Sequence, residues 1–281
     1  MAASEDGASS TGRDGRAGGM SRQAPEMRCQ VVAPLQDALA VLAGFGAGLI
    51  NTMVGSGTLI IFPVLLLSGM SPIAANIATN IGLAPGSISA AVGYWSAVPP
   101  PRRRVYLPCC IAASAAIGGA ALLLFLPPGV FTNAAVVMIG IAVVLAIFQV
   151  RLNRAFTSRH GAASGGSWHV GLSVFATSVY GAYFGAGQST ILFSLMAILM
   201  IESLQEVNAL RNVLLAVDNT VAAVIYAFAM PVDWTTVLFI AIGATIGGQV
   251  GARISKKVSP RVLRAAVVAV GVVGIIELLQ K

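Results

Sequence analysis

Residues 38–201 contain no aspartate or glutamate, and they consist of apolar runs separated by short breaks. Across the whole chain 57% of residues are hydrophobic and 10% are charged, which is more apolar surface than a soluble domain of 281 residues can bury. In lipid every backbone N–H and C=O group needs a partner within the protein, and barrel strands would alternate apolar with polar residues. The sequence therefore predicts an all-α integral membrane protein whose first partner is the lipid bilayer.

The net charge of +7 belongs to basic clusters between the apolar runs. These clusters are Arg102, Arg103 and Arg104; Arg151, Arg154 and Arg159; and Arg253, Lys256, Lys257, Arg261 and Arg264. Lys and Arg beside a bilayer set the orientation of a membrane protein, and no aromatic residues alternate with these clusters. We therefore expect no nucleic-acid partner.

Charges, prolines and polar clusters divide the chain into four regions and ten apolar segments. The regions are a polar, disordered tail at 1–32, a first membrane repeat at 33–150, a cytoplasmic linker at 151–168 and a second membrane repeat at 169–281. The segments are roughly 33–54, 58–69, 73–95, 105–126, 130–150, 169–184, 188–201, 206–230, 234–251 and 261–279. The second and seventh segments are shorter than the roughly 20 residues that a crossing needs, so they are interpreted as half-helices, tilted pieces or re-entrant segments. About eight to ten transmembrane segments are expected, two of them short or broken.

Loop charge tests the topology of these segments. If all ten cross and the N-terminus is outside, the three basic clusters all fall in the cytoplasm. Five crossings in each half would then make the two repeats inverted. An N-terminus inside, with the second segment failing to cross, satisfies the clusters too, but it treats the halves unequally. We favour ten crossings.

The two halves repeat one pattern of a glycine break, a short apolar run and a polar stripe. The first copy contains Gly55, Gly57, Asn76, Asn80, Ser87 and Tyr94, and the second contains Gly185, Gly187, Asn208, Asn212, Asn219 and Tyr226. The copies are offset by 132 residues in the stripe and by 130 at the glycines. Matched breaks in two homologous halves are typical of transporters whose binding site lies between the repeats at mid-membrane.

The stripe residues share one face of each predicted helix, because positions seven apart drift by only about 20°. Asn76 and Asn208 lie one turn earlier on the same face. Their amide groups must find partners in hydrocarbon, and they would serve as donors to an anion. The alternative is that Asn76, Asn80, Asn208, Asn212 and Asn219 join helix to helix through hydrogen bonds.

The glycine breaks permit close backbone approach, and each precedes a short segment whose positive N-terminal end would face an anion. Small residues also pack membrane helices routinely, so one such break alone carries little weight. With a break in both copies, a substrate site is expected there. Its lining would include Thr58, Thr79, Gln188, Ser189 and Thr190.

Arg211 and Asp218 are the charged residues well inside a predicted span, seven positions apart on the eighth segment. A buried Arg attracts an anionic substrate, and an Asp at mid-depth can exchange a proton during transport. The alternative is a structural ion pair with Glu202 or Glu206. The first half has Thr79 and Gly86 at the matching positions, so any charge coupling would be asymmetric.

Other chemistry has little support in the sequence. The adjacent Cys109 and Cys110 lack a C-x-x-C spacing, and His160 and His169 form no metal-ligand pattern. There is no nucleophile elbow, P-loop or H-E-x-x-H motif. We expect no enzyme activity, no metal and no cofactor.

Residues 44–79, 179–192 and 208–233, followed by the run IGGQVGARISKKV at 246–258, resemble the sulfite exporter TauE/SafE family of membrane transporters. The similarity extends over about residues 35–279. It implies a permease of the bacterial inner membrane with two related halves that moves small anions such as sulfite, sulfoacetate or related sulfonates. The family signatures match Gly55, Gly57, Asn76 and Thr79 in the first half, and Gly185, Gly187, Asn208 and Asn212 in the second. Thr58 stands where the family often has glycine, which puts the substrate in question.

The sequence as a whole predicts a multi-pass permease that moves a small anion by alternating access between two repeats. A passive anion channel is the alternative in mechanism. A membrane enzyme or an assembly factor without transport is the alternative in class. A homo-oligomer is compatible with all three.

Overall fold

The computed structural model describes residues 38–53, 55, 57–101, 105–127, 129–131, 134, 137, 140 and 167–254. All regular structure in these residues is helical, and they contain no strand. The all-α prediction is therefore confirmed for the described part of the chain. The predicted tail at 1–32 and nearly all of the predicted linker at 151–168 lie outside it.

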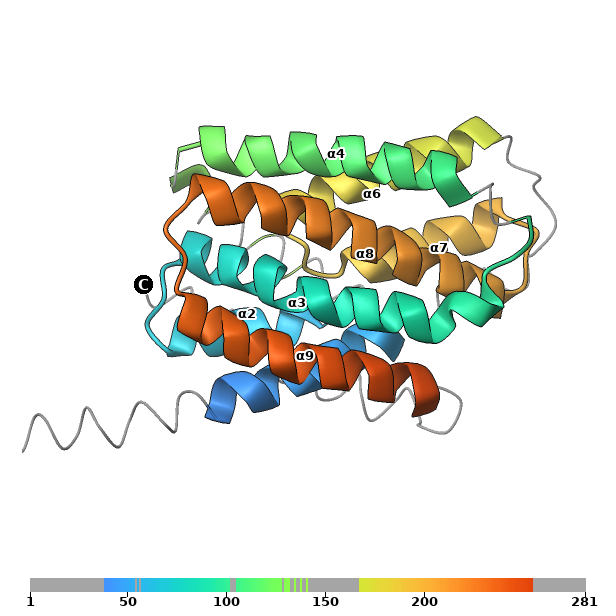
Figure 1. The fold of residues 1–281 in the computed structure, drawn as a ribbon. Coiled ribbons are helices and arrows are strands. Elements are labelled where there is room, and N and C mark those ends of the chain that lie inside the picture. Colours follow the sequence, from blue (N-terminus) through green and yellow to red (C-terminus); the bar gives the residue numbers. More distant parts are fainter. Residues whose placement is uncertain are drawn as a thin grey trace, which may run out of the picture. The chain divides into compact units, whose positions relative to one another are not determined.

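The described helices follow the predicted segments to within a few residues. They are Ala38–Met53, α2 (Thr58–Leu67), α3 (Pro72–Tyr94), the 3₁₀ turn η1 (Trp95–Ala97), α4 (Tyr106–Phe125), α6 (Ser167–Tyr183), α7 (Gln188–Leu199), α8 (Leu204–Ala229) and α9 (Trp234–Ile254) (Figure 1). Most of the predicted segment 130–150, and all of 261–279, lies outside the described residues.

Matched serines begin the two long polar helices. The Ser71 hydroxyl accepts a hydrogen bond from the Ala74 amide, and Pro72 occupies the first helical position of α3. Ser203, 132 residues later, forms a capping box with Glu206 at the start of α8. Each serine satisfies an amide that the first helical turn leaves without a partner. The repeat therefore includes the signal that starts the helix.

Two helical hairpins contain the short segments. With 10 and 12 residues, α2 and α7 are about 15 and 18 Å long, well below the thickness of a bilayer core. Helix α7 folds back along α6, because Val170 at the start of α6 and Met200 just after α7 line the same cavity. Helix α2 likewise starts against Ala38–Met53, where Gly57 packs on the Ala47 carbonyl.

The backbone turns at the two hairpin tips are alike. The Gly55 amide donates to the Ile50 carbonyl at 3.0 Å, and the Gly185 amide donates to the Tyr180 carbonyl at 3.2 Å. Gly55 has φ of +91° and Gly185 has φ of +79°, a left-handed conformation that side chains with a Cβ rarely adopt. Glycine at both tips therefore allows each helix to end and the chain to turn back.

The fourth helix of each half packs against the other half. Helix α9 lies against Ala38–Met53 and α3, where glycines let the backbones approach closely, as at Gly44 beside Ile240. Helix α4 lies against α6 and α8, with Gly119 beside Val179. The helices therefore form two groups. Each group contains the hairpin and the long polar helix of one half, together with the fourth helix of the other half.

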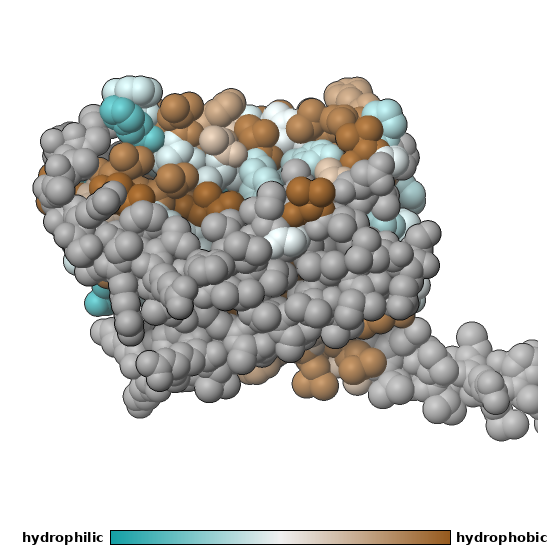
Figure 2. Space-filling view, turned by 180° about the vertical axis from the view of Figure 1, so that it is seen from behind, coloured by the Kyte–Doolittle hydropathy of each residue, from teal (hydrophilic) through white to brown (hydrophobic). Residues whose placement is uncertain are grey.

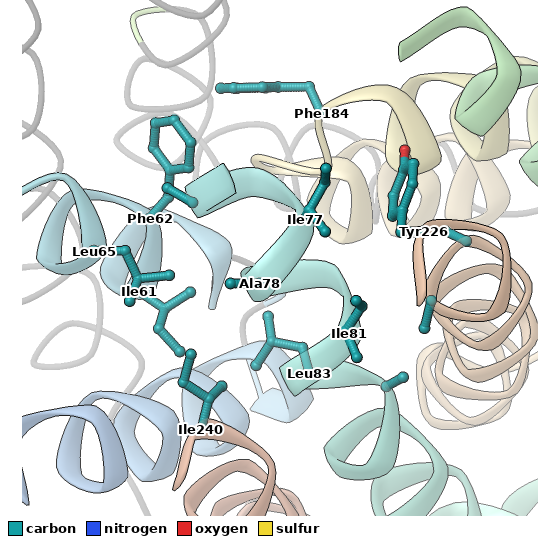
Figure 3. Close-up of a cluster of buried hydrophobic side chains, with 14 of the residues drawn as sticks. Ile61, Phe62, Leu65, Ile77, Ala78, Ile81, Leu83, Phe184, Tyr226 and Ile240 are labelled. Carbon is teal, nitrogen blue, oxygen red and sulfur yellow. The ribbon is translucent and has the colours of Figure 1, made fainter. Parts of the chain in front are cut away.

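Two clusters of buried apolar side chains are separated along the bundle by a layer of polar side chains. In Figure 3, α2 residues such as Ile61 lie on one side of Ile77 in α3, and Tyr226 of α8 lies on the other side. Along α8, the cluster that contains residues 207–214 ends before Asp218, and the cluster that contains residues 222–226 begins after it. Polar side chains of α8 are therefore held at mid-depth in the bundle.

The outer surface fits a bilayer. Three described helices, α4, α8 and α9, are long and apolar enough to cross a membrane. Large apolar side chains such as Phe125 and Phe228 are exposed. In the view of Figure 2, the described surface has patches of hydrophobic residues beside white and teal ones. Trp168 and Trp234 are exposed at helix ends, as interfacial aromatics are. The number of crossings stays a prediction.

Candidate functional site

The tips of the two hairpins touch each other in the interior. The Thr58 hydroxyl, at the start of α2, donates to the Gly185 carbonyl at 3.1 Å. From the other side, Gly55 lies so close to α7 that a Cβ placed there would be 2.6 Å from Ser189 Oγ. The two glycine breaks, predicted to form one site, are thus brought together with the first turns of both short helices.

Neither short helix has a side-chain cap at its N-terminus. The N-cap residues are Gly57 for α2 and Gly187 for α7, and glycine has no side chain that could accept from the first-turn amides. The Ile60 and Thr190 amides donate to the Gly57 and Gly187 carbonyls. The amides at a helix start carry a partial positive charge, which favours a negatively charged group. The Ser189 hydroxyl beside them is buried and has no hydrogen-bond partner. This arrangement can bind a small anion.

Many donors of the asparagine stripes are used within the protein. The Asn76 amide donates to the Tyr183 carbonyl at 3.0 Å and thereby joins α3 to the end of α6. Asn80 and Asn212 both donate to the carbonyl four residues earlier, at Asn76 and Asn208. Asn76 therefore joins two helices in this conformation, whereas Asn80 and Asn212 bond within their own helices.

One contact joins equivalent positions of the two repeats. The Asn219 amide donates to the Ser87 hydroxyl at 2.7 Å, and these residues are 132 apart, the offset of the repeat itself. Ser87 lies in α3 and Asn219 lies in α8, so this bond joins the long polar helices of the two halves.

Side chains of α8 also cap the broken helices. The Tyr226 hydroxyl donates to the Ala182 carbonyl in the last turn of α6. In the other hairpin, Arg211 Nη2 donates to the Thr52 carbonyl at 2.9 Å and approaches the Asn51 carbonyl at 3.4 Å. A cation is favourable at the C-terminal end of a helix, where carbonyl groups lack partners.

Arg211 is 1% exposed and makes no ion pair among the described residues. Its Nε has no partner, and its guanidinium lies over the Phe193 ring at 5.7 Å. Glu206, one of the partners considered from the sequence, is held instead by Ser203 in the capping box. The guanidinium therefore keeps one free donor at mid-depth.

Asp218 is held from the first residue of α7. Its Oδ2 accepts a hydrogen bond of 2.6 Å from the Gln188 amide, whereas Oδ1 has no partner. The Ser178 hydroxyl of α6 lies beside the carboxylate without completing a hydrogen bond. The sequence analysis did not select Ser178, because a lone serine in an apolar helix gives no signal of its place in the fold.

The remaining predicted residues vary in their surroundings. Thr79 is buried, and its hydroxyl donates to the Ala75 carbonyl in its own helix, so it offers no donor to a ligand here. Asn208 is only partly buried at the start of α8. A cavity of about 500 Å³ lies apart from the hairpin tips, between the first turns of α4 and α6 and the end of α7, with lining residues such as Pro108 and Leu199.

Apolar helices with two broken hairpins that meet at a buried polar cluster are typical of membrane transport proteins. Residues 40–278 match the family model described as Sulfite exporter TauE/SafE. Because the match covers most of the chain, the protein belongs to that family of membrane transporters, which confirms the resemblance seen in the sequence. No curated protein matches the chain. No solved structure matches it.

Proposed function

We propose that this protein carries a small sulfur-containing anion, sulfite or an organosulfonate, across the bacterial inner membrane by alternating access. The anion binds between the hairpin tips, against the first turns of α2 and α7. The observation that carries this proposal is the pair of uncapped helix starts beside the unpartnered Ser189 hydroxyl. Oxyanions of sulfur have several acceptor oxygens, which suit a cluster of backbone amides and a hydroxyl.

The two halves act as inverted repeats in this proposal. Helix α9 rises in parallel with α3, since Gly82 is beside Ile240 and Gly93 is beside Ala252. Helices α3 and α8 run in opposite directions, because Tyr94 at the end of α3 shares a cluster with Val207 near the start of α8 (Figure 1). The hairpins enter from opposite ends and return, as re-entrant segments do. Such halves can rock about one fixed site.

Basic residues support a cytoplasmic assignment for one end of the bundle. The last turn of α3 packs against the last turn of α9, which contains Arg253, and the first turns of α4 and α6 pack together at Ile111 and Gly171. The described helix ends that adjoin the three predicted basic clusters in the sequence therefore all lie at this end of the bundle. Clustered Lys and Arg face the cytoplasm.

Uptake into proteoliposomes tests the function. Purified protein is reconstituted, and radiolabelled sulfite and sulfoacetate are offered outside vesicles preloaded with the same unlabelled anion. A carrier gives transient accumulation of label above equilibrium, because it exchanges one anion for another on each turn of the cycle. A channel gives only equilibration, which would overturn alternating access. No movement of either anion, compared with empty vesicles, would overturn the substrate class.

A further inference from the structure

The carboxyl group of Asp218 is buried with no cation beside it. The residue is 1% exposed, its Oδ2 has one neutral partner in Gln188, and its Oδ1 has none. An ionised carboxylate in low dielectric costs several kcal/mol unless it is paired, so a group held this way exchanges protons when its surroundings change. The burial, the single neutral partner and the unpartnered oxygen set Asp218 apart from the exposed Asp233.

Arg211, the cation of α8 among the described residues, is engaged elsewhere. Arg211 is two turns earlier on α8, about 10 Å along the helix axis, and its guanidinium donates to the Thr52 and Asn51 carbonyls. The two residues form no ion pair in the described structure. Arg211 therefore stabilises the end of the Ala38–Met53 helix and leaves Asp218 without a direct counter-ion.

The elements packed around Asp218 supply few other titratable groups. The titratable neighbour is Tyr226, on α8 itself. Ser178 of α6 and Gln188 of α7 are polar neighbours that do not titrate near neutral pH. Helix α7 has no ionisable side chain, α3 has only Tyr94, and α4 has no Asp, Glu, Lys, Arg or His. The imidazole of α6, at His169, is exposed in its first turn. Among these groups, Asp218 is the only carboxyl at this depth.

We propose that Asp218 is a proton-binding site, and that one proton travels with the anion, in the same direction, in each transport cycle. This rests on the proposed function. Gln188 links the two sites, because it is the first residue of α7, where the anion binds, and it also holds Asp218 Oδ2. An anion at the start of α7 is a like charge beside the carboxylate, and like charges favour the protonated form.

The direction of coupling follows from this repulsion. Binding of the anion raises the affinity of Asp218 for a proton, and by linkage the proton raises the affinity for the anion by the same factor. The proton comes from water on the entry side and forms an O–H bond at Oδ1, the oxygen without a partner. On the exit side the anion leaves, the O–H bond breaks, and water takes the proton. Antiport would require the anion to displace the proton, opposite to the electrostatic preference.

Proton movement in the unmodified protein is the first test. Proteoliposomes are loaded with a pH-sensitive dye, the voltage is held at zero with potassium and valinomycin, and sulfoacetate is added outside. Sulfoacetate is useful here because it does not titrate near neutral pH. We expect the interior to acidify as sulfoacetate enters, and an inward proton gradient to raise its accumulation several-fold. Net uptake of sulfoacetate without acidification, or with alkalinisation, would overturn the proposal while leaving the proposed function intact.

Variants assign the proton to its site. Asp218→Asn should lose both acidification and gradient-driven accumulation of sulfoacetate. Asp218→Glu should restore acidification, and Asp233→Asn, a matched change at an exposed carboxylate, should leave coupling as in the parent. Coupling that persists in Asp218→Asn would overturn the assignment. If that variant fails to fold, the acidification measured with the parent and with Asp218→Glu still decides whether protons move with the anion.

Discussion

At the residue scale, buried polar atoms without partners gather around the broken helices. They are Ser178 Oγ, Ser189 Oγ, Arg211 Nε and Asp218 Oδ1. Such a group costs about 1–3 kcal/mol, so native proteins keep few of them outside functional sites. Because these four lie on α6, α7 and α8 near the hairpin tips, their cost is explained by a ligand, a proton or water that binds there during transport.

Ser189→Ala tests whether an unpartnered hydroxyl serves the anion. The change removes no hydrogen bond within the described structure, so thermal stability in detergent should stay close to that of the parent. A lost hydrogen bond to a charged ligand costs about 1.5–3 kcal/mol, which predicts affinity for sulfite or sulfoacetate weaker by about tenfold or more. Ser114→Ala, at an exposed hydroxyl of α4, is the control. Equal affinities in both variants would remove Ser189 from the site.

Gly55→Ala tests the close approach of the hairpin tips. Gly55 and Gly69 share a φ of +91°, so alanine at either position strains the backbone by about 1–2 kcal/mol. At Gly69 the added Cβ meets open space, whereas at Gly55 it would lie 2.6 Å from Ser189 Oγ and 3.0 Å from the Thr190 amide. We expect Gly55→Ala to lower the unfolding temperature more than Gly69→Ala does, and to reduce uptake per folded molecule at least tenfold, whereas Gly69→Ala keeps the uptake of the parent. Equal uptake would show that the tips do not need this contact.

At the element scale, the two hairpins are capped differently, and the difference indicates a second conformation. The Ala182 carbonyl accepts from Tyr226, and the Tyr183 carbonyl accepts from Asn76. The matching carbonyls of the first hairpin belong to Thr52 and Met53, and the matching donors are Tyr94 and Asn208. In the described structure the Arg211 guanidinium donates to the Thr52 carbonyl instead. In the opposite-facing state we expect Tyr94 and Asn208 to take these carbonyls.

Paired tyrosine variants test this exchange of caps. Tyr226→Phe removes a bond of the present state, and Tyr94→Phe removes one expected only in the other state. A hydrogen bond of about 1 kcal/mol corresponds to a roughly fivefold change in the ratio of states, in opposite directions for the two variants. Spin labels at Ser68→Cys and Ile201→Cys, in a background without native cysteines, would report the two populations as two distances. A shift of both variants in one direction would contradict the exchange.

The helices themselves were predictable from the sequence, because apolar length and the repeated polar stripe determine them locally. Ser71 and Ser203 even mark the starts of α3 and α8. What the sequence could not supply was the partner of each donor. Asn76 was predicted either to face the substrate or to join two helices, and its bond to the Tyr183 carbonyl connects residues more than a hundred positions apart. The packing of α4 and α9 against the opposite half could not be predicted either, because those contacts also join residues far apart in the sequence.

At the scale of the whole molecule, loop charge cannot distinguish a hairpin from two crossings. A re-entrant hairpin returns to the side from which it came, and so does a pair of full spans, so both place the basic clusters in the cytoplasm. Ten crossings were favoured from the sequence because the alternative treated the two halves unequally. The short lengths of α2 and α7 and the packing of α7 along α6 instead support hairpins. A hairpin and a pair of full spans differ in how deeply the helices enter the membrane, and amino-acid composition gives no information on that depth.

The relative orientation of the halves gives a final prediction. If the repeats are inverted, the turn between α2 and α3 and the matching turn between α7 and α8 face opposite sides of the membrane, although their sequences occupy equivalent places. Ser68 and Ile201 are exposed in these turns, so each is replaced by cysteine in a background without Cys29, Cys109 and Cys110. With the basic clusters inside, a maleimide that cannot cross the membrane should label position 68 in intact cells and position 201 only after permeabilisation. Labelling of both positions from the same side would mean that the halves are parallel, and a single mid-membrane site between two opposed hairpin tips would then be impossible.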